Sequence, residues 1–180
     1  MSTLVDYQIK TLSKAWKMIA PYRKEQQNPA SYDVTISSKI LIEKPLEPAI
    51  ISHDIIKTVD DRWLELDIFD KPYSLAPGEF ILASTSELIT LPDDIEAVFC
   101  LKSSRGREGW EHALAGYIDP GFSGRITLEL KNNNRYYPLE LSLGLKIGQI
   151  RFFKLNDRPN KPYSLTGRYH NDQTTTPSKG

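Results

Sequence analysis

The sequence has one cysteine, no long apolar run and no excess of charge, and each absence excludes a class of protein. A lone cysteine, Cys100, cannot form an internal disulfide framework and suits a reducing compartment. Its neighbours, in the run AVFCL, predict a buried small hydrophobic residue rather than a nucleophile. No apolar run reaches the roughly eighteen residues that a membrane-spanning helix needs. The 23 basic and 23 acidic residues cancel, so we expect neither nucleic acid nor a membrane as a partner.

Histidine and cysteine are also too sparse for a zinc site. Zinc-dependent nucleobase deaminases hold the ion with a His or Cys and a Cys-x-x-Cys pair. Here Cys100 stands alone, and His53, His112 and His170 lie far apart without ligand spacing. If this chain deaminates a base, we expect it to do so without zinc.

At 180 residues the chain fits one domain with its own hydrophobic core. Five apolar residues near the N-terminus recur at helical spacing: Val5, Ile9, Leu12, Trp16 and Ile19. This pattern ends at Pro21 and predicts a short amphipathic helix over about residues 4–20, with the stripe facing the core. Charged residues interrupt the same segment, which lacks the apolar core of a signal peptide, so the cytoplasm is the expected location.

Beyond the helix, short alternating runs are separated by Gly, Pro, Asn and Asp. The runs predict strands at Tyr32–Ser37, Leu64–Phe69, Glu79–Ala83, Glu87–Leu91, Ile95–Leu101, Arg125–Lys131, Leu139–Leu143 and Gln149–Leu155. Many short strands with turn residues between them and little helix favour an all-β sandwich, jelly-roll or barrel.

Residues 156–180 have a different composition, with three prolines, a threonine run and almost no apolar residues. Such a segment cannot build a core, and by composition it is a frayed tail. The alternative is a segment that orders over a bound ligand. Its useful groups would then be Tyr163, Arg168, Tyr169 and Lys179.

The stretch from Ala115 to Leu130, AGYIDPGFSGRITLEL, joins an Asp-Pro-Gly turn to an alternating strand. Alternation sends the even-numbered apolar residues from 126 to 130 toward a core and the odd-numbered polar residues to the opposite face. Glu129 is thereby displayed beside a turn whose backbone could contact a small ligand. It is the best candidate for proton transfer, although most strand carboxylates simply face solvent. Asp119 either forms the turn or accepts a hydrogen bond from a sugar hydroxyl.

A second polar segment, Lys102–Arg107, gathers three cations and two hydroxyls in a predicted loop after a strand. These groups suit phosphate oxygens, and a solvated basic loop is the simpler alternative.

Together, these segments resemble the dCTP deaminase family of the trimeric dUTPase-like superfamily over nearly the whole chain. The motifs that carry the resemblance occur in the family's order. They are Asn28–Asp33 (NPASYD), Ala76–Phe80 (APGEF), Leu91–Asp94 (LPDD), Ser103–Arg107 (SSRGR), His112–Glu129, Gly144–Gln149 (GLKIGQ) and Gly167–Lys179.

The resemblance implies a homotrimer of distorted jelly-rolls with active sites between subunits. Residues 1–155 would form the dUTPase-like β domain, and residues 156–180 would close over the nucleotide. The family hydrolyses the cytosine amino group of dCTP, giving dUTP and ammonia, with Mg²⁺ bound through the triphosphate and without zinc. Three alternatives remain: a bifunctional enzyme that continues to dUMP and pyrophosphate, a plain dUTPase, and a non-catalytic nucleotide-binding regulator. An acid at Glu129 favours deamination over plain dUTPase activity.

By position in the family's motifs, Glu129 would move protons between water and the base. Ser103 and Arg107 would help to fix that water and the phosphates, and Ala115 would offer its backbone to the water. The resemblance implies further nucleotide-binding roles for Lys102, Ser104, Asp119 (sugar hydroxyl), Thr127 and Leu128 (base, through backbone), Gln149, Tyr163, Arg168 and Gln173.

Several positions depart from the family's pattern. Arg168 and Lys179 keep the charge of the residues that they replace, and Ser142 and Leu143 replace the usual residues before Gly144.

Three other positions also differ. Lys102 replaces an arginine and loses its bidentate fork. Asp172 replaces a glutamine, and a carboxylate there would repel triphosphate unless magnesium intervenes. Thr174 replaces a glycine and gives up backbone freedom. These changes bear on nucleotide affinity and lid closure more than on the chemistry at Glu129.

Overall fold

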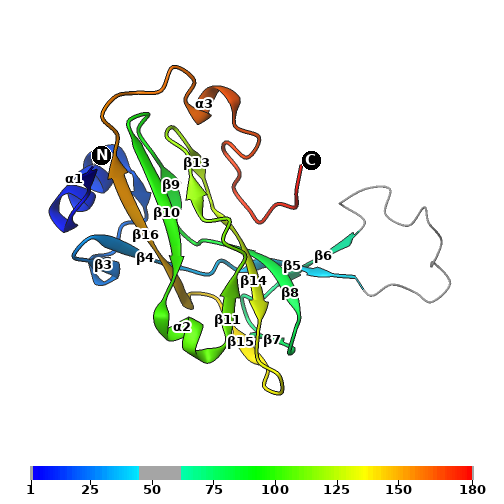
Figure 1. The fold of residues 1–180 in the computed structure, drawn as a ribbon. Coiled ribbons are helices and arrows are strands. Elements are labelled where there is room, and N and C mark those ends of the chain that lie inside the picture. Colours follow the sequence, from blue (N-terminus) through cyan, green and yellow to red (C-terminus); the bar gives the residue numbers. More distant parts are fainter. Residues whose placement is uncertain (1, 45–61, 180) are drawn as a thin grey trace.

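The computed structural model describes residues 2–44 and 62–179. Antiparallel strands dominate it, and most belong to two sheets (Figure 1). The first has the order β12-β10-β16-β4-β3, with β1 beside β16; its strands are Tyr117–Ile118, Ile95–Leu101, Lys146–Lys154, Ser31–Thr35, Gln27–Asn28 and Ser2–Thr3. The second has the order β11-β14-β8-β5-β6, with strands Trp110–His112, Thr127–Asn132, Phe80–Ser84, Lys39–Glu43 and Trp63–Asp67. The all-β prediction is confirmed.

Smaller elements complete the fold. One short sheet joins β13 (Ser123–Gly124), β9 (Leu88–Thr90) and β2 (Ile19–Ala20), and another joins β15 (Leu139–Leu141) to β7 (Tyr73–Leu75). The helices are α1 (Asp6–Trp16), a 3₁₀ turn (Lys24–Gln26), α2 (Ser103–Glu108) and α3 (Tyr163–Thr166). No helix in the described ranges has both the length and the apolar character to cross a membrane.

One hydrophobic core lies between the two large sheets. The alternation predicted for β14 is confirmed, because Leu128 and Leu130 are fully buried while Lys131 on the other face is exposed. The first sheet contributes Tyr32, Val34, Ala97, Phe99, Ile150 and Phe152 to the same core. Burial of such side chains from both sheets provides the main driving force for this arrangement.

All eight predicted strands are present, with ends displaced by three residues or fewer. The sequence did not indicate β5, whose residues Ile40, Leu41 and Ile42 form a continuous apolar run. Both faces of β5 are covered, since Ile40 belongs to the main core and Leu41 to a second cluster with Trp63 and Leu82. A strand covered on both faces lacks the period of two on which the prediction relied.

The N-terminal helix is shorter than predicted and its stripe is only partly buried. Lys17 adopts a left-handed conformation with φ 55°, which ends the helix at Trp16. Trp16 is 74% exposed, so placing it on the core face was wrong, whereas Ile9 is fully buried. Ile19 does reach the core, but from β2 after the chain has turned.

Two further expectations need correction. The segment predicted as a loop at Lys102–Arg107 is largely helical, because α2 spans Ser103–Glu108 and ends where Gly109 adopts φ 100°. Cys100 is half-buried rather than fully buried. It lies on the face of β10 opposite Ala97 and Phe99, which point into the core. His53 lies outside the described residues.

The C-terminal tail runs along the body of the protein beside β13 and β14 (Figure 1). Its backbone pairs with β13 and with the residue that follows β13. Asn171 N donates to Ser123 O at 2.6 Å, and Arg125 N donates to Asp172 O at 2.8 Å. Thr175 is 4% exposed, and its hydroxyl bonds Lys39 O at 2.7 Å and Ser84 Oγ at 3.0 Å. These contacts favour the ordered alternative over a frayed tail.

Candidate active site

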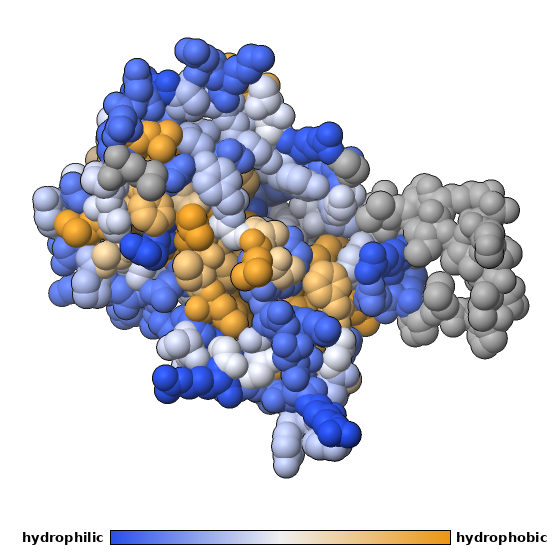
Figure 2. Space-filling model, in the orientation of Figure 1, coloured by the Kyte–Doolittle hydropathy of each residue, from blue (hydrophilic) through white to orange (hydrophobic). Residues whose placement is uncertain are grey.

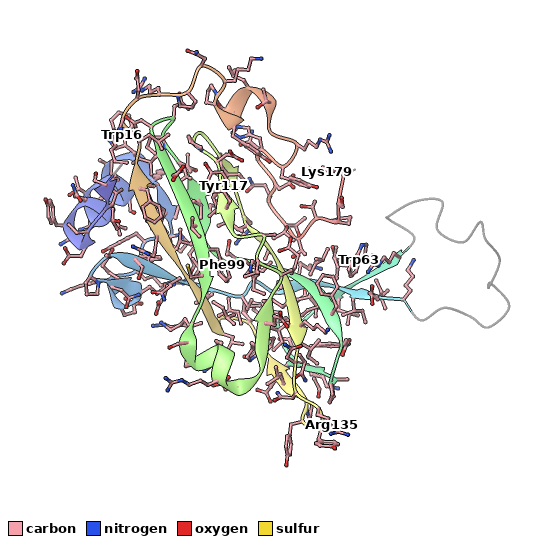
Figure 3. The ribbon with its side chains drawn as sticks, viewed as in Figure 1. Trp16, Trp63, Phe99, Tyr117, Arg135 and Lys179 are labelled. Carbon is pink, nitrogen blue, oxygen red and sulfur yellow. The ribbon has the colours of Figure 1, made fainter. Side chains whose placement is uncertain are left out.

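A cavity of about 520 Å³ lies between the tail, the turn at residues 115–122 and the outer face of the second sheet. Figure 3 shows Tyr117 and Trp63, which line this cavity from β12 and β6, with Lys179 of the tail above Trp63 in this view. Five of the predicted site residues line it: Ala115, Asp119, Thr127, Glu129 and Tyr163. The structure therefore brings together the residues of the central motif and one residue of the tail.

Glu129 lies on β14 opposite Leu82 of β8, and its side chain is 28% exposed. Its Oε2 atom is buried and has no hydrogen-bond partner. His112 Nε2 is 3.4 Å away, which is a close contact rather than a hydrogen bond. The His112 ring is itself held against Phe99, with centroids 4.6 Å apart. A buried carboxylate oxygen without a partner is costly, and a water or base in the cavity would satisfy it.

The Asp119 turn is shaped by Gly121, which has φ 81°. This left-handed conformation favours glycine, and a Cβ at Gly121 would also approach Asp93 Oδ1 to 2.8 Å, so that the Asp93 side chain would have to shift. The tail docks on this turn, because Tyr163 N donates to Pro120 O at 2.8 Å. Burial raises the pKa of the Asp119 carboxyl, and the nearby charge of Glu96 raises it further.

Ala115 is exposed at the start of this turn, between Leu114 and Gly116. Leu114, before it, has φ 63° and is almost fully exposed. Gly116, after it, lies so close to β10 that a side chain there would meet Phe99 O at 2.5 Å. Burial raises the pKa of Tyr117 to about 12, and its hydrogen bond to Glu96 adds to the shift.

Arg125 is a cavity residue that the sequence analysis missed. Its Nη1 donates to Thr85 O at 2.8 Å and to Ser86 O, so it holds the β8–β9 turn against the segment that leads into β14. The only signal for Arg125 in the sequence was its position two residues before Thr127, since residues two apart on a strand lie on the same face. Thr127 also lines the cavity. Tyr169, Asp172 and Thr176 of the tail also line the cavity.

Another five predicted site residues form a second group: Lys102, Ser103, Ser104, Arg107 and Gln149. None of them lines the cavity. Ser103 and Arg107 are exposed on α2, which lies at the opposite end of β10 from the tail (Figure 1). In one chain the predicted site is thus divided into two parts.

The remaining predicted residues have other positions. Leu128 is fully buried in the core, its backbone included, and does not line the cavity. Arg168 and Gln173 are exposed and do not line the cavity. Gln173 instead donates to Asn171 O within the tail, at 3.1 Å.

Asp172, the tail carboxylate that departs from the family's pattern, has its charge balanced by a residue of the tail itself. Its Oδ1 lies 2.7 Å from Lys179 Nζ, and its Oδ2 accepts a hydrogen bond from Thr176 Oγ1 at 2.6 Å. Across the described ranges, no three His, Cys, Asp or Glu side chains gather as a metal site.

Three comparisons relate this chain to known proteins. A model of the dCTP deaminase-like family matches residues 3–155. A "dCTP deaminase, dUMP-forming" of Nocardioides sp. is 39% identical over 170 residues, which cover 89% of this chain and 85% of the relative. A protein of the same name from Dictyoglomus turgidum is 41% identical over 162 residues, covering 86% and 81% of the two chains.

Among solved structures, the 2′-deoxycytidine 5′-triphosphate deaminase of Agrobacterium tumefaciens matches with a TM-score of 0.66 and 25% identity. The match covers 84% of this chain and 48% of that one, so this chain spans about half the length of the Agrobacterium protein. The predicted fold, an all-β jelly-roll of the dUTPase-like type, is confirmed.

Proposed function

The chain belongs to the dCTP deaminase-like family, and we propose that it deaminates dCTP and hydrolyses the resulting dUTP to dUMP. The observation that carries the proposal is the buried, unpartnered Oε2 of Glu129 in a cavity beside the Asp119 turn. The names of the relatives from Nocardioides and Dictyoglomus support dUMP as the final product. A single half-buried cysteine suits a reducing cytoplasm.

In the deamination, Glu129 takes a proton from water as the water oxygen attacks C4 of cytosine. The carboxyl passes this proton to N3 of the base. It then takes the proton of the new C4 hydroxyl and delivers it to the amino group, so that the C4–N bond breaks, ammonia leaves and the ring becomes uracil. Water is consumed and the carboxylate is regenerated, so one side chain acts as both general base and general acid. Ala115, an exposed residue that lines the cavity, would orient the water through its backbone. Thr127, which lines the cavity, would hold the base through its backbone.

In the second reaction, water attacks the α-phosphorus of dUTP and pyrophosphate leaves. Asp119 is suited to bind the sugar hydroxyl and to orient this water, because its raised pKa makes it a better proton acceptor than an ordinary aspartate. Mg²⁺ bound to the phosphates would neutralise their charge. Tyr163 and the rest of the tail would cover the nucleotide.

We expect the complete site to form between copies in a homotrimer. The second group, with Ser103 and Arg107, would then meet the cavity of a neighbouring copy. Figure 2 supports an interface, since apolar side chains gather in the middle of the face on which β10 and β14 lie. Leu114 and Tyr117, close to the cavity, are both exposed large hydrophobic residues. Exposed apolar patches of this kind typically mark interaction surfaces.

Product analysis tests the proposal. The purified protein would be incubated with dCTP and Mg²⁺ while ammonia, dUTP, dUMP and pyrophosphate are followed. We expect ammonia, dUMP and pyrophosphate. Accumulation of dUTP would indicate a deaminase alone, turnover of dUTP but not dCTP a plain dUTPase, and binding without turnover a regulator.

Substitution of the catalytic carboxylate gives the first prediction. Glu129→Gln removes the proton acceptor but keeps the shape of the side chain, so we expect kcat for deamination to fall by about 10²- to 10⁴-fold. Nucleotide binding, measured by calorimetry, should remain. Glu111→Gln is a matched control, because Glu111 is an exposed carboxylate on the neighbouring strand and does not line the cavity. Full deamination by Glu129→Gln would refute the assignment.

A further inference from the structure

A buried ion pair joins two motifs that lie far apart in the sequence. Lys102 Nζ donates to both carboxylate oxygens of Asp33, at 2.7 and 2.8 Å. The Asp33 side chain is only 7% exposed, and that of Lys102 is 27% exposed. Asn28 Nδ2 also donates to Asp33 Oδ1, at 2.8 Å. Lys146 Nζ lies 3.9 Å from Asp33 Oδ2, so three side chains surround this carboxylate and Lys102 makes the two shortest contacts from a cation.

The pair spans one sheet. Asp33 lies on β4, Lys102 follows β10, and β16 lies between these strands. Lys102 is also the residue from which α2 begins: its N donates to Ile147 O at 3.1 Å, and its O accepts from Gly106 N at 3.0 Å. The first turn of α2 is thus tied to the sheet through both the backbone and the side chain of Lys102.

This geometry bears on what Lys102 can do. For Lys102 to bind a phosphate, its ammonium group would have to leave Asp33 or share itself between two anions. If Lys102 left, the buried Asp33 carboxylate would keep only the hydrogen bond from Asn28 and the more distant charge of Lys146, and a buried charge that loses its close partner is destabilising. Asp33 has little access to water that could compensate. Lys102 is consequently better suited to anchor α2 than to contact a nucleotide.

We propose that Asp33 is a positioning residue that acts through Lys102 to hold α2, so that Ser103 and Arg107 are presented to a nucleotide bound in a neighbouring copy. This inference rests on the proposed function, in which those two side chains complete the active site. It assigns to Lys102 a structural contact with Asp33 in place of the phosphate contact that the sequence predicted.

A double-mutant cycle with Asp33→Asn, Lys102→Met and the two combined tests the proposal. We expect each single variant to lose roughly 10- to 100-fold in kcat/KM for dCTP, as expected when a catalytic group is displaced by about 1 Å. The combined variant should lose no more than either single variant, because both changes break the same contact. If Lys102 bound phosphate directly, Asp33→Asn would free its charge and lower KM. A lower KM for Asp33→Asn, or losses that add, would overturn the proposal.

Amide hydrogen exchange at Gly106 and its neighbours in α2 gives a readout that does not depend on turnover. Both single variants should exchange faster there than the wild type, and exchange in the core strand β14 should be unchanged. Unchanged exchange in α2 would also overturn the proposal. If the wild-type protein does not turn over dCTP, the proposed function is refuted. Amide exchange in α2 of the two variants would still show whether Asp33 holds α2.

Asp94→Asn is the matched control. Asp94 forms a carboxylate–lysine pair with Lys154 near the other end of β10 and β16, far along the sheet from α2. The Asp94→Asn variant should leave both kcat/KM for dCTP and amide exchange in α2 unchanged. If Asp33→Asn does not fold, Lys102→Met decides the test through exchange at Gly106, since Lys102 is the more exposed partner.

Discussion

Glu129 and Asp119 line the same cavity and occupy different environments. Glu129 has a buried oxygen without a partner next to His112. Asp119 sits in a half-buried turn where burial and the charge of Glu96 raise its pKa. Distinct environments let two acidic groups perform different tasks in one site. This supports the division of roles proposed above, with proton transfer at Glu129 and the orientation of sugar and water at Asp119.

The raised pKa of Asp119 has a consequence for stability. Because folding raises this pKa, ionisation disfavours the folded state, and stability is lost as the pH rises through the folded pKa. Asp119→Asn removes that penalty, so we expect a higher Tm than the wild type at pH 7. The difference should vanish below about pH 3.9, the ordinary pKa of an aspartate, where the wild-type side chain is neutral in both states.

Thermal unfolding followed from pH 3 to pH 8 would measure this difference. Asp70→Asn, at an exposed position away from the cavity, is the control and should show no comparable gain at pH 7. A lower Tm for Asp119→Asn at pH 7 would mean that the carboxylate stabilises the turn.

At the scale of elements, the tail is held by threonine hydroxyls and by its own ion pair. Thr175 contacts β5 and β8, and Thr176 N donates to Thr127 Oγ1 on β14 at 3.3 Å. Asp172 and Lys179 close the tail on itself. The threonine run, part of a tail too polar to build a core, thus attaches it to the body together with the backbone hydrogen bonds of Asn171 and Asp172.

Thr175→Val keeps the size of the side chain but removes both hydroxyl contacts. Loss of a net hydrogen-bond contribution of about 0.5–1.5 kcal/mol should speed amide exchange in residues 168–179 roughly two- to tenfold. We expect KM for dCTP to rise and the Tm of the body to change little. Thr174→Val is the control, because Thr174 is exposed. Equal exchange in the two variants would show that the hydroxyl of Thr175 does not anchor the tail.

At the scale of the whole molecule, the division of the site into two groups predicts complementation between variants. Glu129→Gln inactivates the cavity, and Arg107→Ala inactivates the second group, so each protein alone should lack activity. Trimers assembled from an equal mixture would contain some sites with an intact residue of each kind. If each site lies between adjacent copies, random assembly gives about one quarter of the wild-type activity.

The measurement is dCTP turnover after the two variants are mixed, unfolded together and refolded. Each variant refolded alone is the control. Absence of recovery, with trimers confirmed by light scattering, would indicate that Glu129 and Arg107 act within one copy and would contradict a shared site.

Local sequence patterns determined the facing of β14, the turn at Asp119 and the boundaries of β10. The period of two in β14 placed Glu129 on the face away from the core, and the Asp-Pro-Gly turn placed Asp119 beside it. The boundaries of β10 were predicted at both ends. These features depend on residues close together in the chain, through side-chain alternation and the backbone freedom of glycine.

Tertiary structure decided the features that depend on distant residues. Lys102 pairs with Asp33 across 69 positions, and Thr175 bonds Ser84 across 91. No local pattern indicated either contact, since the order of strands in the sheets determines which side chains meet. For the same reason the sequence predicted one set of site residues, whereas the fold places five of them in the cavity, five in the second group and three elsewhere. Secondary-structure propensity and hydrophobic periodicity act over a few residues. Only the packing of distant segments brings the ends of β10, β16 and β4 together.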